Sequence, residues 1–185
     1  MLGRAALAAA ALVAGGCGLV AGGAGQSEAR RLECPAIAGT AETSDLRRYR
    51  SAAGRDLTDL VVEARLVAVS GRCEPIERRR DGVRVALAPT IEVTRGPAAQ
   101  GRSLSLPYFV AVADAAGRIP AKQVFDVAVD FPANRSRLRL AGEEVTVDLP
   151  LNPGERASDF TVLVGFQLSG EELATNRRAL AARQR

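Results

Sequence analysis

The chain has 185 residues, which is the size of one domain with a short extension. Its composition, 47% hydrophobic and 25% charged, is globular and excludes a disordered chain or a polytopic membrane protein. The net charge of +4, with 21 acidic residues present, is too small to indicate a nucleic-acid-binding protein. Histidine is absent, so His-containing catalytic triads and His-ligated zinc or haem are also excluded.

The N-terminal segment has the pattern of an export signal. Arg4 is the only charged side chain before Glu28, and Ala and Gly dominate the residues between them. A short basic region followed by an apolar stretch and small residues is typical of a secretory signal. Because the segment contains few strongly apolar side chains, it would insert only weakly as a membrane-spanning helix.

Two cleavage sites compete within this segment. The sequence VAGGC ending at Cys17 resembles a bacterial lipobox, although Ala14 stands where Leu is usual. We therefore expect residues 1–16 to be a signal peptide, Cys17 to carry a lipid anchor, and residues 17–32 to form a flexible tether. Ordinary cleavage before Gln26 and a retained anchor are the alternatives.

The other two cysteines form an even pair. In an oxidising compartment, Cys34 and Cys73 predict a disulfide that links the start of the domain to the end of its first long strand. Two unrelated buried thiols are the alternative. The absence of a C-x-x-C spacing disfavours a redox role.

Alternating apolar and polar residues, interrupted by turn residues, predict strands from residue 60 onward. The first segment also fits a helical stripe, but its four Val favour a strand. Pro89 interrupts the second segment and predicts an edge strand or a bulge there. The seven expected strands span residues 60–70, 83–94, 104–113, 124–131, 135–140, 145–149 and 160–168.

Seven strands at these intervals predict an all-β fold, a two-sheet β-sandwich that is immunoglobulin-like in the loose sense. A small open barrel is the alternative. Residues 33–185 are expected to form this single domain, with a short C-terminal helix capped by Ser169 and Glu172. The expected core consists of Val85, Leu87, Val110, Val112, Phe125, Val127, Val129, Val162, Val164 and Phe166.

Clustered charges are the remaining candidates for a site. Asp126 and Asp130 share one strand face about 13 Å apart, too far for a glycosidase pair, so we expect a solvated face. Arg78, Arg79 and Arg80 lie between two predicted strands, where they either form a solvated hairpin tip or contact phosphates of an anionic surface.

Two further groups are expected to have structural roles. Arg135, Arg137 and Arg139 alternate along one predicted strand and are expected to face solvent. Tyr108 and Phe109 could anchor a ligand, but their strand is apolar on both faces, which favours core packing in a central strand.

Three segments carry a resemblance to a known group of proteins. The sequences RGPAA at 95–99, PYFVAV at 107–112 and VGFQL at 164–168 resemble short, uncharacterised envelope proteins of Gram-negative bacteria, over residues 33–178. This resemblance implies a location in the cell envelope and a single domain, but no activity. Gly18, rather than Asp, follows Cys17, and in this respect the sequence resembles lipoproteins that are sorted to the outer membrane.

We therefore expect a non-catalytic envelope module that is tethered to the membrane by a lipid. It would bind another envelope protein or an anionic surface, with Arg78, Arg79 and Arg80 as contact residues. No cofactor, metal or nucleic acid is expected. The periplasmic face of the outer membrane is the expected location, and a secreted or periplasmic protein is the alternative. An envelope enzyme with a carboxylate-based site is the alternative function.

Overall fold

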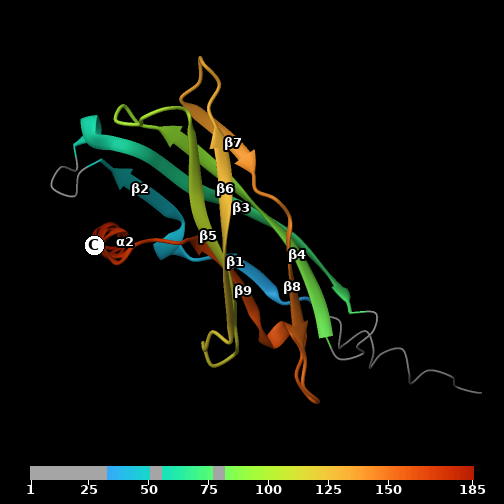
Figure 1. Ribbon diagram of the computed structural model, residues 1–185. Coiled ribbons are helices and arrows are strands. Elements are labelled where there is room, and N and C mark those ends of the chain that lie inside the picture. Colours follow the sequence, from blue (N-terminus) through green and yellow to red (C-terminus); the bar gives the residue numbers. More distant parts are fainter. Residues whose placement is uncertain (1–32, 51–55, 77–81) are drawn as a thin grey trace, which may run out of the picture.

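The computed structural model describes residues 33–50, 56–76 and 82–185. Two β-sheets pack face to face around one core, and a helix lies at one end (Figure 1). The strands are β1 (Ala36–Gly39), β2 (Asp45–Tyr49), β3 (Leu60–Pro75), β4 (Gly82–Arg95), β5 (Ser103–Ala113), β6 (Ala121–Asp130), β7 (Arg137–Ala141), β8 (Val145–Pro150) and β9 (Thr161–Phe166).

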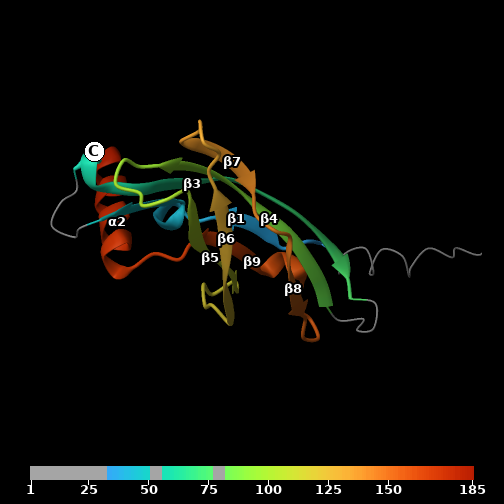
Figure 2. The ribbon, with the colours of Figure 1, turned by 45° about the horizontal axis from the view of Figure 1, so that its top comes forward.

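The four-stranded sheet has the order β1-β9-β5-β6, and the five-stranded sheet has the order β2-β3-β4-β7, with β8 also paired to β4. β1 runs parallel to β9, whereas the other pairs are antiparallel. The turned view shows the two layers of this sandwich (Figure 2). The predicted all-β two-sheet sandwich is therefore confirmed.

All seven predicted strands are present. The segment at 60–70 is a strand rather than a helix, and it extends to Pro75 as β3. β1 and β2 were not predicted. β1 has four residues, and β2 carries charged side chains at Asp45, Arg47 and Arg48, so neither shows a long apolar alternation.

The core agrees with the predicted phase of the strands. Nine of the ten residues expected to be buried are buried, including Val85, Val127 and Val164. Phe125 is only half-buried; it lies on β6, the edge strand of the four-stranded sheet, on which Val127 and Val129 are buried. It stacks on the buried Tyr108, with ring centroids 5.5 Å apart.

Pro89 does not mark an edge strand, because β4 is central in its sheet. On one side of β4, Thr90 pairs with the end of β7 and Leu87 pairs with the start of β8, and Pro89 lies between these two residues. No strand opposes Pro89 on that side, so its missing N–H costs no ladder bond, and its carbonyl accepts a bond from Gly142 N at 2.8 Å. The bulge is next to it in β3, where the register skips Val67.

The predicted disulfide is present. Cys34 and Cys73 are bonded, with their Cα atoms 5.8 Å apart. Cys34 precedes β1 of one sheet, whereas Cys73 lies in β3 of the other sheet. The bond therefore connects the two layers of the sandwich, as well as the start of the domain to the end of its first long strand.

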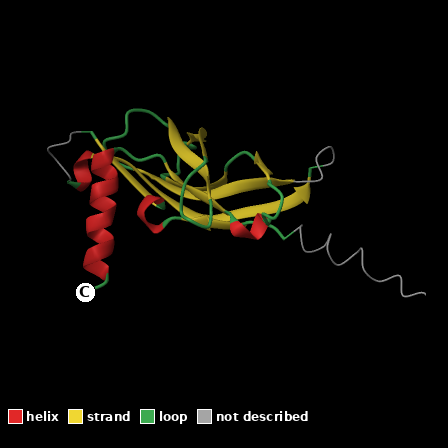
Figure 3. Cartoon of the chain, turned by 90° about the horizontal axis from the view of Figure 1, so that it is seen from below, coloured by secondary structure: helices red, strands yellow, loops and turns green. Residues whose placement is uncertain are grey.

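The C-terminal helix, α2 (Gly170–Arg183), begins with the predicted capping box. Ser169 Oγ accepts a bond from Glu172 N at 3.2 Å, and Glu172 Oε2 accepts one from Ser169 N at 2.7 Å. None of its residues is buried, and it crosses the end of the sandwich rather than lying on a sheet (Figure 3). Within the described residues, no helix has the length and apolarity needed to cross a membrane.

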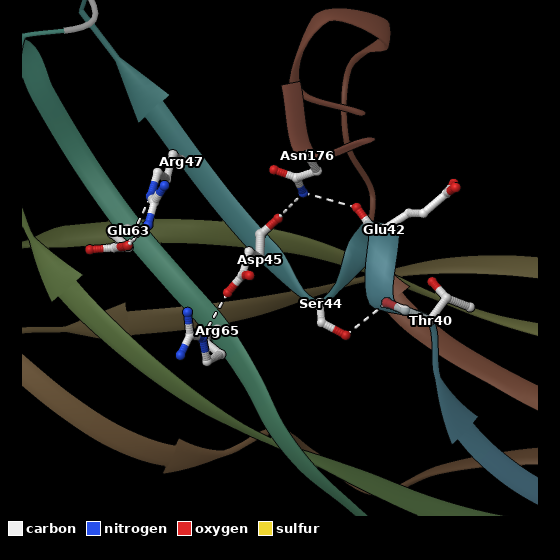
Figure 4. A network of polar contacts seen from close by, with 8 residues as sticks. All are labelled: Thr40, Glu42, Ser44, Asp45, Arg47, Glu63, Arg65 and Asn176. Atoms are coloured by element: carbon white, nitrogen blue, oxygen red, sulfur yellow. Dashed lines mark hydrogen bonds and ion pairs between the residues drawn. The ribbon is translucent and has the colours of Figure 1, made fainter. Parts of the chain in front are cut away.

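Polar contacts hold α2 in place (Figure 4). Asn176 Nδ2 donates to the carbonyl oxygens of Glu42 at 2.9 Å and Asp45 at 2.7 Å, in the short helix η1 (Ala41–Thr43) and in β2. Arg177 Nε lies 2.9 Å from Glu42 Oε2, and Arg48 Nε lies 3.4 Å from Glu172 Oε1. The helix is thereby docked beside β2 and leaves both outer sheet faces open.

Candidate functional site

Several predicted site residues lie outside the described residues. These are Cys17, the expected lipidation site, and Arg78, Arg79 and Arg80, the expected contact residues. The signal peptide at 1–16 and the tether at 17–32 also lie outside them. The expectations about these residues remain predictions, so the search for a site rests on the two outer faces, the sheet edges and the pockets of the described domain.

The outer surface of the five-stranded sheet, here called the charged face, carries rows of alternating charge. Asp45, Arg65, Glu92 and Arg139 lie directly opposite one another on β2, β3, β4 and β7. Arg65 Nε is 2.7 Å from Asp45 Oδ1, and Arg139 Nη1 is 3.6 Å from Glu92 Oε1. Opposite charges at facing positions stabilise the pairing of neighbouring strands.

Further pairs extend this arrangement over the charged face. Arg47 lies opposite Glu63, with Nη2 and Oε1 2.6 Å apart, and Arg84 lies opposite Asp148, with Nε and Oδ1 2.7 Å apart. The hydrogen bond and charge of Asp45 raise the pKa of Arg65. The side chains on this face therefore bind each other, which leaves little of their charge for a partner.

Part of the outer surface of the four-stranded sheet, here called the apolar face, is different. Phe109 and Val124 face each other on β5 and β6, and Ala111 and Leu163 face each other on β5 and β9. Val124 is 48% exposed, a large fraction for an apolar side chain in a strand. We define the apolar face as Ala38, Pro107, Phe109, Ala111, Val124 and Leu163.

Part of the apolar face is covered from within the chain. Thr43 of η1 lies so close to Gly165 that a Cβ atom there would overlap its hydroxyl. The ammonium group of Lys122 lies 4.5 Å from the centre of the Phe109 ring, a cation–π contact. Val124 stays exposed, and it lies on β6, the edge strand, at the margin of the apolar face.

A pocket of about 640 Å³ lies between the β5–β6 turn and the chain from β8 to β9. Its lining includes the apolar residues Val112, Ala121, Leu149 and Phe160 and the polar residues Asp114, Arg118, Asp148, Asn152, Glu155 and Asp159, here called the rim. It has the volume of a small-molecule site.

The rim carboxylates are engaged within the chain. Asp114 accepts bonds from the backbone N–H groups of Ala116 and Arg118, and Arg118 N–H lowers the pKa of Asp114 most. The side chain of Arg156 likewise lowers the pKa of Asp159. Carboxylates held ionised in this way are unsuited to act as general acids at neutral pH. No cluster of metal-ligating side chains occurs within residues 33–50, 56–76 and 82–185.

The predicted acidic pair on β6 lies on the surface, whereas the predicted aromatic pair on β5 is divided between the core and the surface. Asp126 and Asp130 are exposed, as expected, and accept bonds from the Ser105 and Ser103 hydroxyls across the sheet. Tyr108 is buried in the core, whereas Phe109 points outward and is half-buried. The apolar face was missed because a strand that is apolar on both sides was interpreted as one packed on both sides.

The three predicted arginines on β7 and before it are exposed, as expected. Arg139 pairs with Glu92, and Arg137 Nε donates to Thr94 Oγ1 at 3.3 Å. Their register partners could not be read from the sequence, because they lie on another strand.

No protein-family model, no curated protein and no solved structure matches this chain.

Proposed function

We propose that this protein is a non-catalytic binding module of the cell envelope and that the apolar face is its working surface. The observation that carries the proposal is the contrast between the two outer faces. On the charged face, side chains have partners across the strands; on the apolar face, Phe109, Leu163 and Val124 remain uncovered to different extents. Uncovered apolar patches on a folded protein commonly mark interaction surfaces.

Photo-crosslinking tests this function. A photoreactive residue is placed at Val124 on the apolar face or, as the matched control, at Thr146, which is exposed on β8 of the charged face. We expect adducts in the native envelope from Val124 and few from Thr146. Equal yields at the two positions, or adducts from neither, would contradict the proposal, because both residues are exposed on outer strand surfaces.

We further propose that the module is exported and lipid-anchored at Cys17, as the leader sequence predicts. Mass spectrometry of the mature protein tests this part separately. Diacylglycerol on an N-terminal Cys17 is the expected result, whereas a free N-terminus at Gln26 would contradict it. Arg78, Arg79 and Arg80 remain proposed contacts with an anionic surface, tested by changing the three to Ser and comparing the captured partners.

An envelope enzyme with a carboxylate-based site has less support. The candidate acids line the rim of the pocket, where Asp148 pairs with Arg84, and Asp159 pairs with Arg156. The pKa values of Asp114 and Asp159 are lowered, opposite to the shift that a catalytic acid needs. Binding through the apolar face therefore remains the function that the geometry favours.

A further inference from the structure

β6 is the longest edge strand of the sandwich. It has ten residues, whereas the other strands at sheet edges, β1, β2, β7 and β8, have four, five, five and six. Its pairing with β5 runs from Ala121 to Asp130 without a register shift. A long, regular edge is a template for another strand unless its side chains prevent pairing.

The free edge of β6 offers the backbone groups of alternate residues. Phe131 N donates to Arg102 O of the chain leading into β5, at 2.9 Å, so odd-numbered residues in this stretch point their backbone groups toward β5. Lys122, Val124 and Asp126 therefore point their N–H and C=O groups to the free edge. Their side chains lie on the outer surface of the sheet, and all three are exposed.

We propose that β6 pairs antiparallel with β6 of a second copy of this chain, with Val124 opposite Val124 of the partner subunit. In this register Lys122 lies opposite Asp126 of the partner subunit, and Asp126 lies opposite Lys122 of the partner subunit. Each of these three positions is a hydrogen-bonded pair, because the backbone groups of all three residues point to the edge. The inference rests on the proposed function, since it names the partner of one margin of the apolar face.

Charge complementarity selects a second copy as the occupant. Lys122 is 4.5 Å from the Phe109 ring centre, and it forms no ion pair within the described residues. Asp126 accepts a bond from Ser105 through Oδ1 and likewise has no ion-pair partner there. Lys122 and Asp126 lie two residues before and after Val124 and carry opposite charges. Under a two-fold axis at Val124 each therefore faces its opposite charge, whereas a partner strand that placed a like charge there would be disfavoured.

The pairing would join two four-stranded sheets into one continuous sheet. The two apolar faces would then lie on the same side, with the two Val124 side chains in contact at the centre. This doubles the area offered to a larger ligand and removes the longest exposed edge of each copy.

Cysteine crosslinking on the full chain tests the register. Val124→Cys places two thiols at facing positions, where the Cα separation of a hydrogen-bonded strand pair suits a disulfide. The matched control is Ala128→Cys, on the same exposed surface of β6 but about 27 Å from its counterpart in this register. Mild oxidation should convert most Val124→Cys protein to a covalent dimer, with a yield about tenfold lower from Ala128→Cys.

A reciprocal charge exchange tests the partner without a new thiol. Lys122→Asp should raise the dimer dissociation constant by about tenfold or more, because two acids then face each other in both halves of the interface. Adding Asp126→Lys should restore it to within about threefold of wild type. Sedimentation velocity measures the dissociation constants, and thermal unfolding checks that the variants remain folded.

Each result has a defined meaning. A wild-type chain that stays monomeric, equal crosslinking of the two cysteine variants, or a charge exchange that fails to restore the dimer would overturn the inference. Adducts with another envelope protein from a photoreactive residue at Val124 would support the proposed function even then. In a dimer with the predicted register, the absence of such adducts from a photoreactive residue at Leu163, which lies on β9 away from the paired edge, would instead overturn the proposed function alone.

Discussion

The charged face and the apolar face lie on the outer surfaces of two sheets that share one core. On the charged face, Arg65 stands between Asp45 and Glu92, so each charge faces its opposite. On the apolar face, Phe109 faces Val124, and neither side chain has a polar group that a neighbour could satisfy; the ammonium of Lys122 contacts the Phe109 ring. A face whose side chains satisfy one another needs no partner, whereas an open apolar face lowers its free energy by binding one.

The largest expected effect tests the boundary between the core and the apolar face. Val127→Asp should unfold the domain, because Val127 is buried and an unpaired carboxylate there costs several kcal/mol, comparable to the whole stability. Val124→Asp is the matched control: the same substitution, three residues away, at a position 48% exposed. It should change stability by about 1 kcal/mol or less. Circular dichroism during thermal unfolding separates the two, and a folded Val127→Asp variant would mean that the strand phase is wrong.

The next effect concerns the covalent link between the sheets that carry the two faces. Replacing Cys34 and Cys73 by Ser should lower the free energy of unfolding by about 4 kcal/mol in the chain-entropy model, because the bond closes a loop with a sequence separation of 39. Urea unfolding measures the loss. Reduction of the wild-type protein should give a similar value, and an unchanged midpoint would argue against this link.

A smaller effect tests why α2 leaves the apolar face open. Asn176→Ala removes two hydrogen bonds to the carbonyls of Glu42 and Asp45. It should weaken docking of the helix by about 1–2 kcal/mol. Hydrogen exchange should accelerate in α2 while protection in β9 and β5 is retained. Thr175→Ala, one position earlier, is the control, because the Thr175 hydroxyl donates to Glu171 O and accepts from Arg178 Nη2, and both partners lie within α2.

The smallest expected effect is the pH dependence of the charged face. The side-chain hydrogen bond of Arg72 lowers the pKa of Glu144, so the folded protein binds this proton less readily than the unfolded chain. The resulting stabilisation is present above the unfolded pKa, about 4.3, and is lost as the pH falls through the lower folded pKa. Glu144→Gln should make the loss of stability below pH about 4.3 less steep, as urea unfolding at several pH values would show. An unchanged slope would mean that this exposed pair contributes nothing measurable.

The sequence analysis succeeded where the signal is local. The alternation in 124–131 predicts which side chains of β6 enter the core, and Ser169 with Glu172 predicts the start of α2 within one turn. Counting cysteines was enough for the Cys34–Cys73 bond, because only two remain after the leader.

The missed features depend on strand order, which no single segment encodes. Pro89 does not mark an edge, because it lies in a central strand that has two short partners on one side, and the bulge lies in the facing strand β3. Arg139 faces solvent, as expected, but its ion pair with Glu92 was not predicted, because Glu92 belongs to a strand far away in the sequence. Phe109 was interpreted as packed because its strand is apolar on both sides. Without the sheet order, a covered face and an open face look the same in one strand.

The pairing of β1 with β9 has a consequence for the order of assembly. Ala36 lies beside Thr161, so the first strand of the domain pairs with its last. A chain emerges from the ribosome N-terminus first, and such distant pairing forms slowly. Leu163 of the apolar face therefore takes its place only after the whole domain has emerged. A chain that ends before β9 would lack Leu163 and so could not offer the complete apolar face to a partner.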